Sequence, residues 1–392
     1  MSADDYSTTF TLAGTLGGEP VRVAGKAGLP GGAAVGDVAA LAAELIEPAP
    51  GERVALLGCG NGALGAALAR RLRGGKLTLS DPSLIAVRLA RLTLAANGVA
   101  GATVSEAPSL LPQGAASFDR VVVLAPQSRA LGRRWLVEAH GLLRPGGLLD
   151  LAGANGGGIK PLIADAAALF GAAHTLGYGR GCRVGEAVRA QEPPPAPPWA
   201  GAPGIAPGTW HTLRAELPGG PVELASLPGI FSYDRLDEGT ALLLQHMGSC
   251  AGLRVLDGGC GYGPLGVAAA RLGAARVDML DVSLLAVAAA RENIARLALV
   301  GASAEASDAL EAAAGRSYDL VVSNPPFHAG KAVDTAMAEA FFAQSRALLA
   351  PGGRLLLVAN RFLPYERHLR PRFRRVEAVA QSSAYKVLAA RP

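Results

Sequence analysis

The stretch RVLDGGCGYGPLGVAAARLG, Arg254–Gly273, decides the fold, and a second version of it occurs earlier in the chain. That version, RVALLGCGNGALGAALARRL, spans Arg53–Leu72. Each version opens with apolar residues typical of a buried strand, passes through spaced glycines that permit a tight turn, and ends in the apolar periodicity of a helix. Strand, glycine turn and helix in that order predict the start of a βαβ unit.

The similarity between the two halves continues beyond this stretch. Three further pairs match in the same order: LSDPSLIAVRLARLTLAANGV from Leu79 with LDVSLLAVAAARENIARLALV from Leu280, SFDRVVVLAPQ from Ser117 with SYDLVVSNPPF from Ser317, and LLRPGG at Leu142 with LLAPGG at Leu348. Matches in one order indicate a duplicated domain. The proline-rich segment Gln191–Gly208 favours a stiff spacer without regular structure. We therefore predict a first domain over residues 1–190, a linker over 191–208 and a second domain over 209–392.

Strands and helices are expected to alternate within each copy. In the second copy we predict strands at Arg254–Leu256, Val277–Leu280, Leu320–Ser323 and Arg354–Val358, and helices at Leu265–Leu272, Leu284–Leu297 and Ala338–Leu349, the last ended by Pro351-Gly352-Gly353. Such alternation predicts two tandem Rossmann-like α/β domains, each with a doubly wound, mostly parallel sheet. In these folds ligands bind at the carboxyl ends of the strands.

The composition is that of a globular protein with two domains. The chain has 392 residues, of which 50% are hydrophobic and 18% charged, and this length exceeds what one core usually supports. No apolar run is long enough to span a membrane, and the first residues lack the pattern of a signal peptide. The four cysteines show no Cys-x-x-Cys spacing, so we expect a cytoplasmic protein without a metal site.

The segment Asp257–Gly263 predicts a cofactor site. Its D-x-G-x-G-x-G pattern brings Gly259, Gly261 and Gly263 between a strand and a helix, and Asp281 ends the next strand, where an acid can accept from ribose hydroxyls. A glycine loop alone also fits NAD, but the G-x-G-x-x-G spacing is missing and an acid ends the first strand. That acid suits the ammonium group of S-adenosylmethionine. Asp308 is placed to receive the adenine amino group, with a helix N-cap as its competing role.

The segment Ser323-Asn324-Pro325-Pro326-Phe327-His328 predicts the reacting site. Consecutive prolines cannot continue a central strand, so the segment follows its carboxyl end. The Asn324 side-chain oxygen and the Pro325 carbonyl can accept hydrogen bonds from an exocyclic base amine and draw its lone pair out of the ring plane. Phe327 offers a face for stacking a flipped base, with Pro326 beside it, and His328 is a weaker candidate for seating the base. The competing interpretation is an Asn-Pro turn with Phe327 in the core.

A basic segment near the end of the chain suits phosphate contacts. The net charge is +5, and six arginines lie within fifteen residues against one acid, Glu366. These are Arg361, Arg367, Arg370, Arg372, Arg374 and Arg375. Such density predicts RNA binding, although a solvated surface is an equal alternative.

These residues together resemble the ribosomal RNA guanine-N2 methyltransferase family, RsmC of the small subunit and its large-subunit relative RlmG. The resemblance rests on SNPPFH, on the glycine loop, on Leu227–Ser232 and on Ala359–Tyr365, and it covers most of the second half. It implies a class I S-adenosylmethionine-dependent enzyme with catalysis in the second domain. It also implies that Phe231–Thr240 covers the methionine end of the cofactor. The expected substrate is ribosomal RNA, most simply 16S rRNA, or a ribosomal subunit, bound by a monomer.

The first copy departs from the pattern where chemistry is expected. Leu56 stands in the place of Asp257, and Leu124-Ala125-Pro126-Gln127 in the place of Asn324–Phe327. We therefore expect this domain to position RNA or stabilise the protein, with Arg70 and Arg71 among its candidate phosphate contacts. Three alternatives remain from the sequence: a 23S rRNA guanine-N2 enzyme, an adenine-N6 or protein-glutamine methyltransferase, and a noncatalytic RNA-binding assembly factor.

Overall fold

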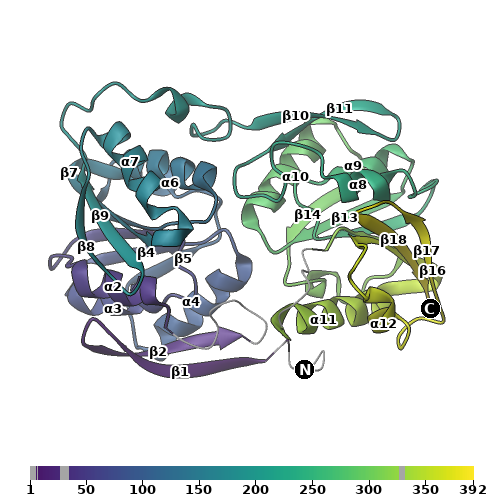
Figure 1. Cartoon of the computed structure of the whole chain (residues 1–392), viewed down its shortest axis with the longest axis horizontal. Helices are drawn as coiled ribbons and strands as arrows, with labels where there is room; N and C mark the ends of the chain where they lie inside the picture. Colours follow the sequence, from purple (N-terminus) through teal and green to yellow (C-terminus); the bar gives the residue numbers. More distant parts are fainter. Residues whose placement is uncertain (1–5, 7, 27–34, 326–331) are drawn as a thin grey trace. The chain divides into compact units, whose positions relative to one another are not determined.

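The structure, a computed structural model, describes residue 6 and residues 8–26, 35–325 and 332–392. The chain forms two compact units, labelled by element in Figure 1. The first unit is Thr9–Trp210, and the second unit joins Met1–Thr8 to His211–Pro392. Tyr6 therefore packs with the second half, although the sequence of the whole first unit lies between them.

The second unit is built on a seven-stranded sheet in the order β14-β13-β12-β15-β16-β18-β17. Its strands are β12 (Arg254–Gly258), β13 (Arg276–Asp281), β14 (Ala302–Ala306), β15 (Tyr318–Ser323), β16 (Leu349–Asn360), β17 (Arg375–Gln381) and β18 (Tyr385–Arg391). The first five strands in the sheet order are parallel, and β18 and β17 add an antiparallel edge. The sheet order changes direction at β12 and β15, which is where open α/β sheets bind ligands.

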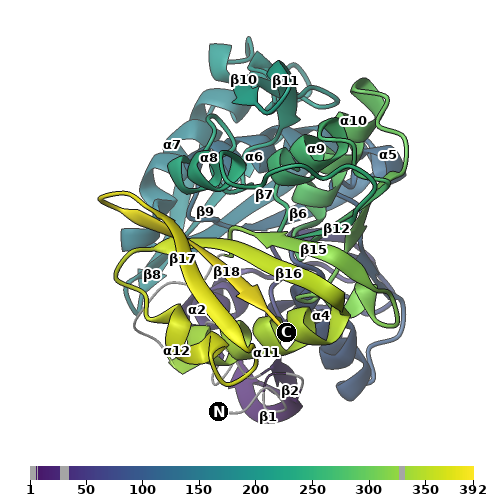
Figure 2. The same ribbon diagram turned by 90° about the vertical axis from the view of Figure 1, so that its right-hand side faces the viewer.

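Helices cover both faces of this sheet (Figure 2). The helices α8 (Glu238–Leu244), α9 (Pro264–Arg271) and α10 (Leu284–Arg296) lie on one face, and α11 (Ala332–Leu348) and α12 (Tyr365–Leu369) lie on the other. A hairpin of β10 (His211–Leu217) and β11 (Gly220–Ser226) precedes them. The buried Asn293 of α10 bonds both polar backbone groups of Ala225 and donates to the carbonyl of Tyr262, which ties the hairpin to the glycine loop.

The first unit repeats this topology, with the sheet order β5-β4-β3-β6-β7-β9-β8. Its strands are β3 (Arg53–Leu57), β4 (Lys76–Ser80), β5 (Ala102–Ser105), β6 (Phe118–Leu124), β7 (Leu143–Ala154), β8 (His174–Gly179) and β9 (Cys182–Val188). Its helices are α2 (Asp37–Leu45), α3 (Ala63–Arg71), α4 (Leu84–Ala96), α5 (Leu111–Gly114), α6 (Arg129–Leu142) and α7 (Ile159–Phe170), and the hairpin of β1 (Thr9–Leu16) and β2 (Glu19–Lys26) precedes them. The predicted doubly wound fold in both halves is confirmed.

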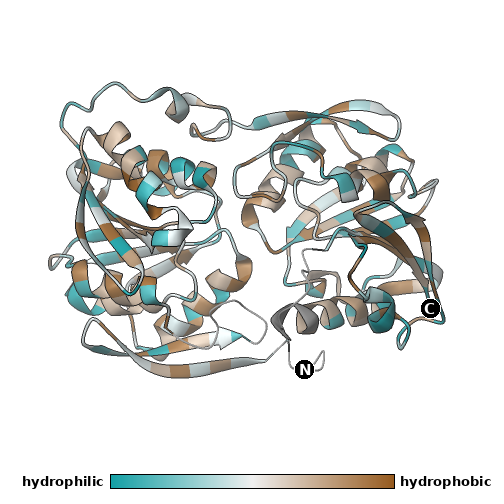
Figure 3. Ribbon diagram, viewed as in Figure 1, coloured by the Kyte–Doolittle hydropathy of each residue, from teal (hydrophilic) through white to brown (hydrophobic). Residues whose placement is uncertain are grey.

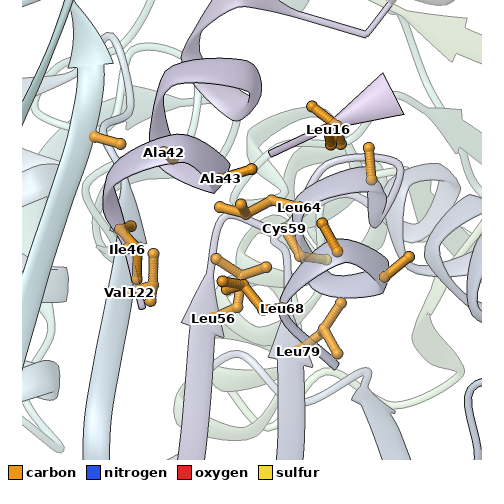
Figure 4. Close-up of a cluster of buried hydrophobic side chains, with 14 of the residues drawn as sticks. Leu16, Ala42, Ala43, Ile46, Leu56, Cys59, Leu64, Leu68, Leu79 and Val122 are labelled. Carbon is orange, nitrogen blue, oxygen red and sulfur yellow. The ribbon is translucent and has the colours of Figure 1, made fainter. Parts of the chain in front are cut away.

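Each unit has its own cluster of buried hydrophobic side chains. Figure 3 shows hydrophobic residues in the strands and helices of both units. The core of the first unit joins β3 and α3 to α2, as Figure 4 shows for Leu56, Leu64 and Ile46. The core of the second unit centres on Phe341 and Phe342 of α11 with Leu357 of β16. No helix among the described residues is long and apolar enough to cross a membrane.

The element boundaries differ from the sequence prediction, most of all for α11 and β16. The α11 helix begins at Ala332 and ends at Leu348, and Pro351-Gly352-Gly353 lies inside β16. The register between β15 and β16 shifts there, because a proline has no amide to donate to the ladder and is tolerated only at such an irregularity. In the proline-rich segment, a short 3-10 helix, η2 (Pro198–Gly201), interrupts the expected extended spacer. The guanidinium carbon of Arg133 lies over the ring of Trp199 in η2, 4.9 Å from the centre of that ring.

Candidate active site

The glycine loop of the second unit follows β12 and leads into α9. Gly259, Gly261 and Gly263 all have positive φ, +73°, +57° and +91°. Residues with a Cβ rarely adopt this left-handed conformation, so three glycines are needed for the chain to turn here. The turn brings backbone N–H groups and the start of α9 to the carboxyl edge of the sheet, where the partial positive charge of a helix N-terminus favours polar ligands.

Asp257 is buried at the end of β12 and carries an unsatisfied oxygen. Its Oδ2 accepts from the amide of Gly266 at 2.8 Å. Its Oδ1 has no hydrogen-bond partner among the residues that the structure describes. Burial raises the pKa of Asp257 to about 7. A buried polar atom without a partner is costly, and a cationic ligand would satisfy both the atom and the charge.

Asp281 is fixed at the end of β13 by two backbone bonds. Its Oδ2 accepts from the amide of Gly261 and its Oδ1 from that of Ser283, both at 2.8 Å. Burial raises its pKa, and the amides of Ser283 and Gly261 oppose that shift. Each carboxylate oxygen has two acceptor positions, so the two bonds leave capacity for the ribose hydroxyls predicted from the sequence. Asp281 therefore shapes the glycine loop before any ligand arrives.

Asn324 follows β15 next to the glycine loop. The hydroxyl of Ser323 donates to the carbonyl of Gly258 at 2.6 Å and holds the two strand ends together. The side-chain amide of Asn324 donates to Oδ2 of Asp237 at 2.9 Å and to Oγ1 of Thr240 at 2.8 Å. An ionised carboxylate only accepts hydrogen bonds, so the NH2 group must face Asp237. The Asn324 side-chain oxygen is thereby turned toward the opposite side.

Asp237 is a site residue whose role the sequence pattern did not reveal. It is the N-cap of α8, where its Oδ2 accepts from the amide of Thr240 at 2.9 Å as well as from Asn324. One carboxylate thus starts the helix and orients the amide 87 positions away. An Asp followed by helix formers indicates a cap, and only the folded chain shows its second partner.

Other predicted site residues fall in different surroundings. Thr240 is buried and contacts Asn324, whereas the side chain of Phe231 is 66% exposed. Pro325 is buried directly after Asn324. Pro326, Phe327 and His328 lie outside the described residues. The roles of these residues remain predictions.

Asp308 lies two positions after β14, next to the Asp281 edge. The amide of Ser307 donates to the carbonyl of Asp281 at 2.9 Å. Asp308 is not a helix N-cap, because the following 3-10 helix, η3 (Glu311–Ala313), has Leu310 at that position and no side-chain cap bond. The side chain of Asp308 is buried and accepts at Oδ1 from the hydroxyl of Tyr6 at 2.5 Å.

The basic segment of the second unit separates into two groups. Arg372 pairs with Glu339 of α11 at 2.6 Å, and Arg375 pairs with Glu377 at 2.7 Å. The other arginines are exposed and have no ion pair within the described part of the chain; they are Arg361, Arg367, Arg370 and Arg374. The fold thus supplies Glu339, an acid that lies far from the basic segment in sequence. These four arginines are the stronger candidates for phosphate contacts.

The first unit keeps the frame of this site without its chemistry. Asp81 accepts from the amides of Gly60 and Ser83, both at 2.9 Å, as Asp281 does in the second unit. Leu56, however, is fully buried in the apolar cluster of Figure 4. The ring of Trp135 packs against Gly58, where an added Cβ would lie 2.8 Å from it. An apolar residue replaces the acid, and an indole ring packs against the loop.

Two of the predicted phosphate contacts of the first unit have partners within that unit. Arg71 donates to the carbonyls of Ile46 and Gly17, and Arg70 lies 3.4 Å from a carboxylate oxygen of Glu19. These side chains hold α3 against its neighbours. The expectation that they contact RNA phosphates stays a prediction.

Comparison with known proteins identifies the family. The family model "Methyltransferase small domain" matches residues 22–184 and 221–389, one match in each half. The ribosomal RNA small subunit methyltransferase C of Chromohalobacter salexigens is 36% identical over 71% of this chain and 80% of its own length. The ribosomal RNA large subunit methyltransferase G of Pseudomonas paraeruginosa is 35% identical over 86% of this chain and 87% of its own.

A solved structure extends the similarity to the whole chain. The T. thermophilus 16S rRNA N2 G1207 methyltransferase (RsmC), in complex with AdoMet and guanosine, covers 100% of both chains with a TM-score of 0.79 and 29% identity. The similarity to this solved structure therefore includes both halves of the chain. The resemblance stated from the sequence is confirmed: this chain belongs to the family of S-adenosylmethionine-dependent ribosomal RNA guanine-N2 methyltransferases.

Proposed function

We propose that this enzyme transfers a methyl group from S-adenosylmethionine to the exocyclic N2 of a guanine in 16S ribosomal RNA. The observation that carries the proposal is the orientation of Asn324. Its NH2 group is held by Asp237 and Thr240, and its oxygen is therefore available to an amine donor. The same arrangement supports an amine acceptor in preference to a nucleophile or a general base.

The residues fit the cofactor at three points. The unpartnered Oδ1 of Asp257 offers a buried counter-charge to the methionine ammonium group. Asp281 offers acceptor positions to the ribose, and Asp308 lies beside it for the adenine amino group. When bound, S-adenosylmethionine supplies an electrophilic methyl carbon. The protein supplies the binding, the orientation and the exclusion of water.

The chemistry asked of the protein is mainly positioning. The lone pair of guanine N2 is delocalised into the ring, so the amine is a poor nucleophile until its hydrogens are held. The Asn324 side-chain oxygen and the Pro325 carbonyl would accept from that NH2 group, which aims the lone pair at the methyl carbon. The base must leave its stack to reach the strand ends. The exposed arginines of the second unit would hold the phosphates on either side.

The small subunit is preferred because the solved relative that covers the entire chain is named for position G1207 of 16S rRNA. The large-subunit relative, which matches 86% of the chain, keeps 23S rRNA as the second candidate. We expect the enzyme to act as a monomer in the cytoplasm, where ribosomal subunits assemble. We assign substrate binding to the second unit and expect the first unit to position the RNA.

The test is deletion of the gene followed by mass spectrometry of nucleosides from separated 16S and 23S rRNA. Loss of N2-methylguanosine from 16S rRNA alone is expected, with restoration by the wild-type gene. Loss from 23S rRNA would transfer the function to the large subunit. Unchanged N2-methylguanosine in both RNAs would overturn the proposal.

A variant pair tests the role of the site. Asn324→Ala should keep cofactor affinity and lose most methyl transfer, because the amine acceptor is removed while Asp257 and Asp281 stay in place. Gln127→Ala, an exposed residue after the corresponding strand of the first unit, is the control and should transfer normally. Undiminished transfer by Asn324→Ala would show that the acceptor role is wrong.

A further inference from the structure

A residue from the start of the chain reaches the predicted adenine end of the cofactor site. Tyr6 belongs to the second unit, although the whole first unit separates it from that unit in sequence. Its side chain is 4% exposed and packs with Ala336 and Ala340 of α11. Its hydroxyl donates to Oδ1 of Asp308 at 2.5 Å, across 302 positions of sequence.

The geometry is that of a charge-assisted hydrogen bond. Bonds from a hydroxyl to a carboxylate are short, about 2.5–2.7 Å, and stronger than neutral ones. Burial, then the nearby charges of Asp308 and Glu311, raise the pKa of Tyr6 well above its usual range. The phenol therefore keeps its proton at every physiological pH and remains a donor to Asp308.

The position of Asp308 gives this bond its significance. Ser307 is tied to the carbonyl of Asp281, so the next residue lies beside the acid assigned to the ribose, where the attached base must follow. A carboxylate has about four acceptor positions, so one that Tyr6 helps to orient can also accept from another donor. A residue that fixes Asp308 thus controls how well the adenine amino group is recognised.

We propose that Tyr6 is a positioning residue of the cofactor site, which orients Asp308 to accept a hydrogen bond from the adenine amino group. This inference rests on the proposed function for the identity of the cofactor. It assigns Tyr6 to the catalytic half. The cofactor site is therefore built from both ends of the sequence, and the segment His211–Pro392 alone lacks part of it.

The test measures binding by titration calorimetry with the full chain and without RNA. The ligands are S-adenosylhomocysteine and S-inosylhomocysteine, in which a carbonyl replaces the adenine amino group. The wild-type protein should prefer the adenine ligand, because the carbonyl would face a carboxylate. Tyr6→Phe keeps the ring and its packing but removes the donor. It should weaken S-adenosylhomocysteine binding about fivefold, the equivalent of one ordinary hydrogen bond, and change S-inosylhomocysteine binding less.

Two controls make the result specific. Tyr178→Phe removes an exposed hydroxyl in the first unit and should leave both affinities unchanged. Asp308→Asn should reduce the preference for adenine, and adding Tyr6→Phe to it should reduce it little further. Equal weakening of both ligands by Tyr6→Phe would mean that Tyr6 only supports the fold. Unchanged or tighter binding of S-adenosylhomocysteine would also overturn the proposal.

The same experiment separates the inference from the proposed function. Binding is measured without RNA, so a protein that binds the cofactor but fails to methylate guanine would sink the proposed function alone. A protein that methylates guanine while Tyr6→Phe keeps full adenine preference would sink the inference alone.

Discussion

Replacing Asp237 by alanine should slow methyl transfer without a change to any residue that touches the base. The substitution removes the charged acceptor that holds the Asn324 amide at 2.9 Å and leaves only the bond to Thr240. Hydrogen bonds to charged groups contribute about 1.5–3 kcal/mol. If that energy serves to orient the acceptor in the transition state, the rate should fall about tenfold to a hundredfold.

The assay is single-turnover transfer at saturating S-adenosylmethionine, so that altered cofactor affinity does not enter the rate. The substitution also removes the N-cap of α8, which costs about 1 kcal/mol of stability. Ser128→Ala, which removes the side-chain cap of α6 in the first unit, reproduces that cost away from the site. Ser128→Ala should transfer at the wild-type rate. Equal rates for Asp237→Ala and wild type would refute the orienting role.

Three further outcomes are expected. Asp257→Asn should weaken cofactor binding yet stabilise the cofactor-free protein increasingly as the pH rises from about 4 to 7. The reason is that burial raises the pKa of Asp257 to about 7 in the folded protein, whereas an aspartate of the unfolded chain ionises near pH 4. Unfolding titrations across pH test this, and a stability difference that does not depend on pH would contradict it. Leu56→Asp should destabilise the protein by at least about 3 kcal/mol by placing an unpaired carboxylate in an apolar cluster, measured by urea unfolding, and it should not create a second cofactor site in calorimetry. Arg370→Ala should weaken RNA binding and lower the slope of log affinity against log salt concentration by about 0.7–0.9. Arg375→Ala should have a smaller effect, because the guanidinium of Arg375 already pairs with Glu377. Equal effects of the two substitutions in filter binding would argue against the division of the basic segment.

Local features of the fold and site were predictable from the sequence. The glycine loop needs positive φ at three positions, so its sequence carries three glycines at a spacing that few other structures require. Asp281, which bonds the loop, stands at the end of the next strand. Because the pattern occurs twice, the first copy predicts the topology of the second, and the two sheets share one strand order. The antiparallel strands β17 and β18 carry no comparable signal, because their pairing with β16 depends on the sheet already formed.

Contacts between distant residues were not predictable. The bond from Asn324 to Asp237 joins two loops that only the sheet brings together. The bond from Tyr6 to Asp308 crosses an entire domain of sequence. Glu339, which neutralises Arg372, lies on another helix. Periodicity and motif spacing describe residues that are close along the chain. Pairs of distant residues have no such pattern in the sequence.

The clamp that Asp81 and Asp281 place on their glycine loops has a consequence for how sequence motifs are interpreted. In both units the carboxylate closes the loop through two backbone amides, so the acid has a structural role even in the domain that has lost its chemistry. A search based on spaced glycines and that acid will therefore report two cofactor domains in proteins of this kind. The informative position is the buried residue near the end of the first strand, which is aspartate in one copy and leucine in the other. An aspartate there costs stability in the cofactor-free protein, so its presence indicates a ligand site.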